Sequence, residues 1–337
     1  MGPDAVASMV ARRTFLGMLG VGIAAVPLTA DAQMAGKPYR IAYLGNSSAT
    51  QEADLVAAFR QGLRELNYVE GQNIVIDFRW AEGRYERFPT LLADAIRLNP
   101  DVIVTAGTPG ALAAKNATKT IPIVLAVIAD PIRVGVVPSL ARPGGNITGS
   151  ATMLHDLAGK RLELLKELVP RVSRIAVIWN PSNPANLSLI EELKDAAAKL
   201  RLTIEPMVGG INDRELQKGF AAIAAARPDA LAVEPDRALL VHRAQITAFA
   251  AKRRLPAIYP YREYVESGGL ASYAPNFPEL FRRAAGYVDK VLKGAKPADL
   301  PIEQPTTFEF ILSVKTAKVL ELPVPQSLLL RADHVIR

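Results

Sequence analysis

Two stretches of this chain open in nearly the same way, although they lie far apart in the sequence. Residues 40–46 (RIAYLGN) and 174–180 (RIAVIWN) are short apolar runs that end in small polar residues. Each run is followed by apolar residues at helical spacing, which predicts amphipathic helices near 52–66 and 186–200. A buried strand that leads into a helix places its polar exit residues at the carboxyl edge of a parallel sheet, where ligands of α/β proteins bind. Two such edges in one chain predict two lobes that face each other across a cleft.

The rest of the chain also alternates between strands and helices, which indicates βαβ units with right-handed crossovers. Half of the residues are hydrophobic, as expected for parallel strands that are covered by helices on both faces. We therefore predict the α/β class, with two doubly wound parallel-sheet lobes and a central cleft. The predicted strands are 39–45, 73–80, 101–106, 121–128, a short one about 147, 174–179, 202–208, 230–234, 256–260, 269–274 and 307–313. The predicted helices are 52–66, 85–98, a short one after 107–110, 157–168, 186–200, 213–226, 237–254, 261–267, 278–293, 315–321 and 325–331.

The order of the predicted elements divides the chain into two lobes. The first lobe is expected to comprise residues 37–152 and 276–300, and the second lobe residues 153–275 and 301–337. The sequence has no low-complexity segment and no long flexible linker, so several short crossings should join the lobes. Multiple crossings limit the relative motion of two lobes to a hinge, which is the geometry of closure around a ligand.

The first residues have the pattern of an export signal, predicted to span residues 1–32. Arg12 and Arg13 precede an apolar stretch at 16–25, which is shorter than the roughly 20 residues of a membrane-spanning helix. The small residues Ala30 and Ala32 flank Asp31 and offer a cleavage site. The spacing of the arginine pair before Phe and Leu favours twin-arginine export, and general secretion remains the alternative. Either route predicts a periplasmic protein that is cleaved near Ala32.

The composition argues against several classes of protein. The chain has no cysteine, so an exported form has no disulfide and no lipid-anchored cysteine at the cleavage site. The net charge is +7, but the basic residues are scattered, without the interleaved aromatic residues of a nucleic-acid surface. We expect a freely soluble monomer that neither spans a membrane nor binds nucleic acid.

The familiar catalytic constellations are not found in the sequence. The histidines, His155, His242 and His334, are far apart and form no pair at metal-ligand spacing. A Gly-x-Ser-x-Gly nucleophile elbow does not occur. The sequence therefore predicts no catalytic residue, no metal and no cofactor.

Several motifs occur in the same order as in a known family. They are 129–131 (ADP), 140–149 (LARPGGNITG), 268–273 (GGLASY), 296–310 (KPADLPIEQPTTFEF), 315–320 (KTAKVL) and 325–333 (PQSLLLRAD). With these motifs the chain resembles bacterial ABC-transporter substrate-binding proteins from about residue 38 to 336. Many members are known only as a periplasmic component, and some bind tryptophan or phenylalanine. The resemblance implies the type I periplasmic-binding-protein fold, with three crossings and the ligand in the cleft.

Polar residues at the predicted strand ends are the candidate ligand contacts. Those of the first lobe are Asn46, Ser47, Gly107, Thr108 and Asp130, and those of the second are Asn180, Ser182, Asp236, Tyr259 and Glu263. An amino acid requires donors around its carboxylate and an acceptor for its ammonium group. Ser47, Thr108 and the backbone N–H groups at the following helix starts suit the carboxylate. Asp130 or Asp236 suits the ammonium group through a charge-assisted hydrogen bond.

Each candidate also has a purely structural interpretation. Asn46, Ser47 and Ser182 have the residue types that cap helices. Asp130 precedes a proline, as residues that start turns do. Asp236 stands where an acidic residue favours a helix start. The sequence leaves both interpretations open.

The function predicted from these observations is capture of a small organic ligand and its delivery to an ABC importer. The partners would be an inner-membrane permease and its ATPase, and the predicted ligand is an amino acid, in particular an aromatic one, or a related carboxylate. Ligand binding would shift an equilibrium between open and closed lobes. Two alternatives remain: a ligand-sensing subunit of a membrane receptor, and a periplasmic enzyme on the same fold.

Overall fold

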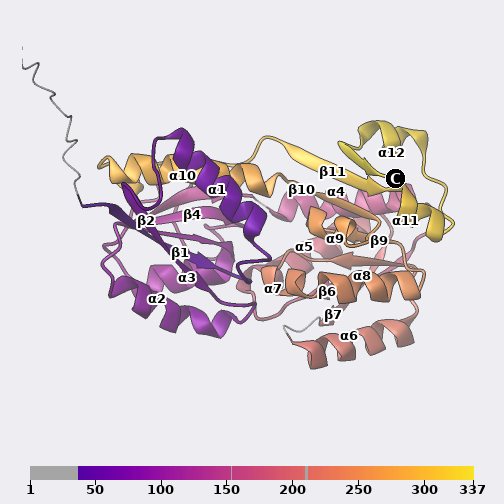
Figure 1. Ribbon diagram of the computed structural model, residues 1–337. Coiled ribbons are helices and arrows are strands. Elements are labelled where there is room, and N and C mark those ends of the chain that lie inside the picture. Colours follow the sequence, from indigo (N-terminus) through magenta and orange to yellow (C-terminus); the bar gives the residue numbers. More distant parts are fainter. Residues whose placement is uncertain (1–36, 153, 209–211) are drawn as a thin grey trace, which may run out of the picture. The chain divides into compact units, whose positions relative to one another are not determined.

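The computed structural model of this 337-residue chain describes residues 37–152, 154–208 and 212–337. The predicted export signal, residues 1–32, lies outside the described residues. Two α/β lobes lie side by side, each built on its own sheet (Figure 1). Within the described ranges, no helix combines the length and the apolar character that a membrane span requires.

The first sheet has five parallel strands in the order β2-β1-β3-β4-β5. Every residue of β3, β4 and β5 is buried, as expected for parallel strands with both faces covered. The strands are β1 (Tyr39–Gly45), β2 (Ile74–Trp80), β3 (Val102–Ala106), β4 (Ile123–Ile128) and β5 (Ile147–Ala151).

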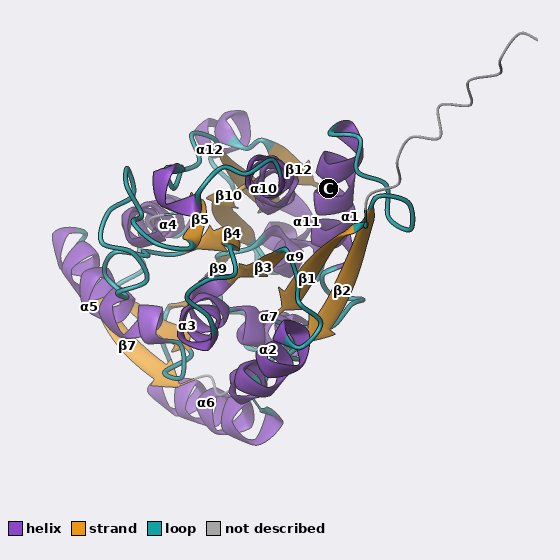
Figure 2. Cartoon of the chain, turned by 90° about the vertical axis from the view of Figure 1, so that its left-hand side faces the viewer, coloured by secondary structure: helices purple, strands orange, loops and turns teal. Residues whose placement is uncertain are grey.

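Helices cover both faces of the first sheet (Figure 2). One face packs against α1 (Ala53–Glu65) and α10 (Phe277–Leu292), which are neighbours despite their separation in the sequence. Gly62 allows this close contact, because a Cβ at Gly62 would lie 2.3 Å from the carbonyl oxygen of Arg282 in α10. The other face packs against α2 (Phe88–Ile96) and α3 (Gly107–Ala117), and the 3₁₀ turns of this lobe are η1 (Tyr85–Arg87) and η2 (Pro297–Asp299).

The second sheet has seven strands in the order β12-β11-β10-β9-β8-β6-β7. All neighbours are parallel except β10 and β11, which are antiparallel because the chain returns to this sheet from the first lobe rather than through a local crossover helix. The strands are β6 (Arg174–Trp179), β7 (Thr203–Val208), β8 (Ala230–Val233), β9 (Ala257–Tyr259), β10 (Ala271–Pro275), β11 (Phe308–Ser313) and β12 (His334–Ile336).

The helices of the second lobe also lie on both faces of their sheet. On one face are α4 (Leu154–Leu168), α5 (Pro184–Lys199), α11 (Val314–Val319) and α12 (Gln326–Arg331). On the other are α6 (Asp213–Ala226), α7 (Arg237–Val241), α8 (Arg243–Lys252) and α9 (Arg262–Glu266). The single helix predicted over 237–254 is wrong, because the backbone leaves helical geometry at His242 (φ −94°, ψ 13°) and separates α7 from α8.

The chain passes between the lobes three times, after β5, after β10 and before β11. The last passage follows residue 303, since Ile302 is part of the first lobe's core and Glu303 forms a bridge with Ser150. The predicted α/β class with two doubly wound lobes is confirmed, with one antiparallel strand pair added in the second sheet.

Candidate ligand-binding site

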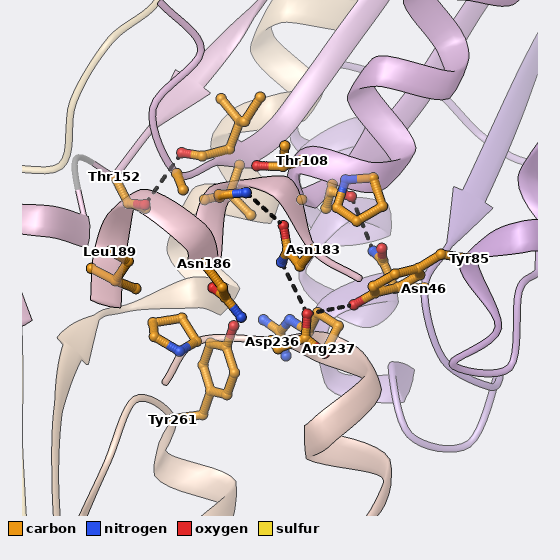
Figure 3. Close-up of a pocket in the computed structure, with 18 of the residues that line it drawn as sticks. Asn46, Tyr85, Thr108, Thr152, Asn183, Asn186, Leu189, Asp236, Arg237 and Tyr261 are labelled. Atoms are coloured by element: carbon orange, nitrogen blue, oxygen red, sulfur yellow. Dashed lines mark hydrogen bonds between the residues drawn. The ribbon is translucent and has the colours of Figure 1, made fainter. Parts of the chain in front are cut away.

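A cavity of about 50 Å³ lies between the two lobes, at the carboxyl ends of their strands (Figure 3). Its first-lobe residues lie at or just after the ends of β1, β3, β4 and β5, together with Tyr85 of η1 and Phe277 of α10, and its second-lobe residues follow β8 and β9 or start α5. The residues that line it are Asn46, Tyr85, Ala106, Gly107, Thr108, Pro109, Val127, Ile128, Ala129, Thr152, Asn183, Ala185, Asn186, Leu189, Pro235, Asp236, Arg237, Tyr261 and Phe277.

The first-lobe side of the cavity presents two polar oxygen atoms with hydrogen-bonding capacity to spare. Asn46 is held by its Nδ2, which donates to the carbonyl oxygen of Ala106 at 3.1 Å. Its Oδ1 and the Oγ1 of Thr108 are buried and have no hydrogen-bond partner among the described residues. Gly107 (φ 72°) adopts the left-handed backbone conformation that lets β3 pass directly into α3 and brings Thr108 to the cavity.

Ser47, in contrast, forms hydrogen bonds that stabilise the loop after β1. Its backbone N–H and its Oγ donate to Glu52 Oε1 at 2.8 and 3.0 Å, and the backbone N–H of Asn46 donates to the same oxygen at 2.8 Å. Tyr43 donates to the other oxygen of Glu52 at 3.3 Å. Buried Glu52 therefore fixes the position of Asn46, and Ser47 does not line the cavity.

On the second-lobe side, the buried carboxylate of Asp236 accepts four hydrogen bonds. Oδ1 accepts from Asn180 Nδ2 at 3.1 Å and from the backbone N–H of Leu239 at 3.0 Å. Oδ2 accepts from Asn183 Nδ2 at 2.9 Å and from the Tyr85 hydroxyl at 3.1 Å, which reach it from different elements (Figure 3). Burial raises the pKa of Asp236 above its ordinary value, and these donors oppose the rise. The acceptor capacity of Asp236 is filled from within the protein.

A buried ion pair holds the end of β8 just before this carboxylate. Arg161 in α4 and Glu234 are 2% and 1% exposed, and Arg161 Nη2 lies 3.1 Å from Glu234 Oε2. Desolvation raises the pKa of Glu234, and the positive charge of Arg161 opposes the rise. The pair fixes the strand end from which Asp236 and Arg237 project.

Arg237 is the cation of the cavity, and its charge is only partly compensated. Its guanidinium carbon lies 4.5 Å from the ring centre of Tyr261 and 4.8 Å from that of Phe277. Nη1 is 3.5 Å from Glu263 Oε1, at the outer limit of a hydrogen bond. Nη2 is buried and has no hydrogen-bond partner in the described part of the chain. The cavity therefore has a guanidinium N–H that can bind an anion.

Three described residues of the first lobe, Tyr85, Gln51 and Arg133, contact the second lobe. Tyr85, on η1 of the first lobe, donates to Asp236 and accepts from the backbone N–H of Ala238 at 3.0 Å. Gln51 Nε2 donates to the carbonyl oxygen of Val241 at 3.5 Å. Arg133, in the loop after β4, forms an ion pair with Glu192 of α5.

Four of the ten predicted contacts line this cavity: Asn46, Gly107, Thr108 and Asp236. The other six lie elsewhere. Asn180 orients Asp236 and accepts from the backbone N–H of Ser182, which is itself exposed. Asp130 Oδ1 accepts from the backbone N–H groups of Ile132 and Arg133, as expected of a residue that starts a turn.

The two remaining candidates lie behind the cavity rather than in it. Tyr259 is fully buried and stacks on Tyr264 at a ring distance of 4.8 Å. Glu263 lies 3.5 Å from Nη1 of Arg237 and does not itself line the cavity.

Sequence analysis missed several residues that line the cavity. Arg237 directly follows Asp236, which is a candidate ligand contact because it comes after a predicted strand. The same position in the sequence could therefore have identified Arg237. Asn183 is the N-cap of α5, whose side chain accepts from Ala185, and the cap pattern was assigned to Ser182 instead. Tyr85 and Phe277 come from a 3₁₀ turn and a helix start, so no rule about strand ends could find them.

The chemical character of the cavity follows from these groups. Among the described residues, its buried polar atoms without hydrogen-bond partners are a guanidinium nitrogen of Arg237 and two neutral oxygens, on Asn46 and Thr108. Aromatic rings of Tyr85, Tyr261 and Phe277 form part of its wall. The described residues contain no group of three or more His, Asp or Glu side chains arranged to hold a metal ion.

Two doubly wound lobes with a cavity between their strand ends define the class of type I periplasmic binding proteins. Within that class, this chain belongs to the ABC transporter substrate binding protein family, whose profile matches residues 49–336. Proteins of this family bind small-molecule solutes outside the cytoplasm and serve ABC transporters.

Individual relatives agree with this assignment. The chain is 30% identical over 265 residues to the tyrosine-binding protein of Clostridioides difficile (strain R20291), covering 78% of this chain and 75% of that protein. A domain from Streptococcus pneumonia, solved in complex with L-Trp, is 29% identical, with a TM-score of 0.82 over 89% of this chain and 100% of that one. A conserved domain protein from Vibrio cholerae is 27% identical, with a TM-score of 0.83 over the same shares.

Proposed function

We propose that this protein binds an L-amino acid with an aromatic side chain and delivers it to an ABC importer. The single observation that carries the proposal is the buried guanidinium of Arg237, whose Nη2 has no partner among the described residues and whose side chain lines the cavity. A buried cation with an unfilled donor favours a ligand that carries an anionic group.

In this proposal Arg237 binds the carboxylate of the ligand. The rings of Tyr261 and Phe277 pack against the guanidinium at 4.5 and 4.8 Å, which helps to position its N–H groups before the ligand arrives. Guanidinium–carboxylate hydrogen bonds are short and about twice as strong as neutral ones. Ser47, assigned to the carboxylate from the sequence, is already bonded to Glu52.

The ammonium group is assigned to the first lobe. Asn46 Oδ1 and Thr108 Oγ1 accept no hydrogen bond in the described structure, whereas Asp236 already accepts four. Asp236 then acts indirectly, by holding Asn183 and Tyr85 at the cavity wall. An amino acid bound in this way has its two charged groups on different lobes, which favours closure of the lobes around it.

The preference for an aromatic side chain rests on the walls of the cavity and on the relatives. Tyr85, Tyr261 and Phe277 offer ring faces and edges for stacking. The relative from Clostridioides difficile is a tyrosine-binding protein, and the domain from Streptococcus pneumonia was solved with L-Trp. The cavity of about 50 Å³ is far smaller than the roughly 300–1,000 Å³ of most ligand pockets, so the lobes must separate to admit such a ligand.

The proposal includes a location and partners. The protein acts in the periplasm as a monomer, after export through residues 1–32 by the twin-arginine route and cleavage near Ala32. It carries out no chemistry on its ligand and docks on an inner-membrane permease that works with an ATPase. The predicted lobes, residues 37–152 with 276–300 and residues 153–275 with 301–337, are kept in the proposal, except that the last crossing is moved to follow residue 303.

Isothermal titration calorimetry with L-tyrosine, L-tryptophan, L-phenylalanine and L-leucine tests the proposal. We expect the aromatic amino acids to bind at least about tenfold more tightly than L-leucine. Phenethylamine, which has the ring and the ammonium group but no carboxylate, should bind about 100-fold more weakly than L-phenylalanine.

The variant Arg237→Gln should lose about 100-fold in affinity for L-phenylalanine, while Arg254→Gln, on the surface of the second lobe, serves as the matched control and should bind normally. The proposal fails if no aromatic amino acid binds, or if Arg237→Gln and Arg254→Gln bind with equal affinity.

A further inference from the structure

A second and larger cavity, of about 240 Å³, lies next to the first. It is bounded by the start of α1 in the first lobe and by α9, β10 and β11 in the second. Phe277 lines both cavities, and Glu263 separates the second cavity from Arg237. The lining residues are Gln51, Asp54, Leu55, Arg262, Glu263, Glu266, Ser272, Ala274, Pro275, Phe277, Pro278, Glu309 and Ile311.

The base of this cavity is formed by alternate residues of two antiparallel strands. Ser272 of β10 is paired with Ile311 of β11, and both side chains point to the face of the sheet that is opposite to buried Ala271 and Leu312. Ser272 is 1% exposed, and its hydroxyl has no hydrogen-bond partner among the described residues. A buried hydroxyl that opens only to a cavity offers its oxygen to whatever occupies that cavity.

The charge of the lining is negative. Asp54, Glu263, Glu266 and Glu309 carry four negative charges, against one positive charge on Arg262 in the lining and one on Arg237, which pairs with Glu263 from outside it, so the formal balance is −2. Arg262 is shared between Glu266 and Glu309, at 3.0 and 3.6 Å. The carboxylates outnumber the cations available to them, so the cavity favours a positively charged occupant.

The arrangement of these groups suits an organic cation better than a metal ion. The described residues contain no group of three or more acidic or histidine side chains that converge as metal ligands. The apolar side chains of Leu55, Phe277 and Ile311 line the same cavity as the carboxylates. An alkyl chain can pack against these while an ammonium group at its end faces the carboxylates.

We propose that this second cavity binds a small aliphatic amine, separately from the ligand of the first cavity. The ammonium group lies between Asp54 of the first lobe and Glu266 of the second and donates to Ser272 Oγ. The alkyl chain covers Leu55 and Ile311. This site goes beyond the proposed amino-acid function and does not depend on it.

The test uses 1,4-diaminobutane as the probe and 1,4-butanediol, of the same length but uncharged, as its control. Calorimetry and thermal unfolding of the purified protein should both detect the diamine, with Tm rising as the diamine concentration rises. The diol should produce neither effect. Raising the NaCl concentration from about 0.05 to 0.5 M should weaken diamine binding, because salt screens the attraction between charges.

Two variants in the second cavity and two control variants elsewhere locate the site. Asp54→Asn combined with Glu266→Gln should weaken diamine binding about tenfold. The control, Glu191→Gln combined with Glu321→Gln, removes two exposed charges elsewhere on the second lobe and should bind the diamine as the unaltered protein does. Ser272→Ala should cost about fivefold. Thr108→Val, in the first cavity, should leave diamine binding unchanged.

Three results would overturn the proposal. They are no binding of 1,4-diaminobutane up to about 10 mM, equal weakening by the cavity pair and the control pair, and loss of diamine binding in Thr108→Val. The last result would place the diamine in the first cavity. None of these outcomes bears on amino-acid binding, which is measured with separate ligands.

Discussion

At the scale of single residues, Tyr85 has the most direct contact with both lobes. Its hydroxyl donates to Asp236 and accepts from the backbone N–H of Ala238, so it satisfies two groups of the second lobe from a position in the first. Burial raises the pKa of Tyr85 well above its ordinary value, with the negative charge of Asp236 adding to the effect. The hydroxyl therefore keeps its proton and remains a donor to Asp236 at any physiological pH.

The substitution Tyr85→Phe should weaken ligand binding about tenfold, mainly through faster dissociation. It removes hydrogen bonds that exist only when the lobes meet, and each buried group left unsatisfied costs about 1–3 kcal/mol. Stopped-flow measurement of the dissociation rate checks this. Tyr287→Phe is the matched control, since its hydroxyl bonds to the carbonyl oxygen of Pro301 within the first lobe. It should lower Tm without changing ligand dissociation, and equal dissociation rates for the two variants would refute the role of Tyr85.

At the scale of elements, the two lobes fix their first strands in the same way. Asp101, just before β3, accepts the backbone N–H of Arg40 at 2.7 Å through its Oδ2. Asp229, just before β8, accepts from the backbone N–H groups of Ser173 and Arg174, both at 2.9 Å. Each aspartate follows a proline and pairs its own backbone N–H with the arginine carbonyl. The two strands that begin with the repeated RIA sequence thus make the same contacts with an aspartate, and these contacts help to set the register with β3 and β8.

Replacing Asp229 by Asn should lower the free energy of unfolding by about 1 kcal/mol at pH 7. Hydrogen bonds from the backbone of Arg174 and Ser173 lower the pKa of Asp229. Its stabilising effect is therefore present above the unfolded-state pKa of about 3.9 and is lost as the pH falls through the lower folded-state value. Urea unfolding at pH 7 and at about pH 2.5 measures both effects.

The unaltered protein and Asp229→Asn should differ in free energy of unfolding at pH 7 and have similar values at about pH 2.5. Because Asp229 is exposed, solvent screens part of the interaction, and a difference much above 1 kcal/mol is not expected. Asp195→Asn, on the exposed face of α5, is the control and should change little at either pH. A difference between Asp229→Asn and the unaltered protein that persists at low pH would contradict this explanation.

How far the sequence could predict these elements depended on burial and on local signals. Strands such as β3 and β4 are apolar throughout and were predicted nearly to the residue. The short strand β12 was missed because its three residues include no buried one, so it lacks an apolar run. Of the residues that line the first cavity, Asn46, Gly107, Thr108 and Asp236 were predicted from their positions after strands. This rule failed for Tyr85, because a distant segment brings that side chain to the cavity through tertiary packing.

At the scale of the whole molecule, the arrangement of the lobes controls access to the first cavity. Residues from both lobes line it, and Tyr85 of the first lobe, which lines it, bonds to Asp236 of the second; Gln51 and Arg133 of the first lobe make further contacts with the second. The crossing after β10 borders the second cavity at Pro275 and Pro278, and the crossing before β11 leads to Glu309 in its lining, whereas the crossing after β5 starts at Thr152, which lines the first cavity. This geometry favours a hinge motion that opens the first cavity while the crossings stay in place.

A disulfide between the lobes tests whether such opening is required. A Cβ at Gly83 of the first lobe would lie 3.8 Å from the Cβ of Ala238 in α7, which matches the usual spacing of about 3.5–4.5 Å in disulfides. The protein has no cysteine of its own, so Gly83→Cys with Ala238→Cys can form one bond only. When it is oxidised, we expect ligand association and dissociation to slow at least about 100-fold, because the lobes cannot separate.

Adding a reductant should restore both rates, and each single-cysteine variant should exchange ligand normally under all conditions. These comparisons separate the effect of the bond from that of the left-handed backbone at Gly83 (φ 76°), where any side chain introduces strain. If the oxidised protein exchanges its ligand as fast as the reduced one, the ligand reaches the cavity by a route that needs no lobe motion. The hinge would then serve docking on a membrane partner rather than capture, and the hydroxyl of Tyr85 would lose its role in retaining the ligand.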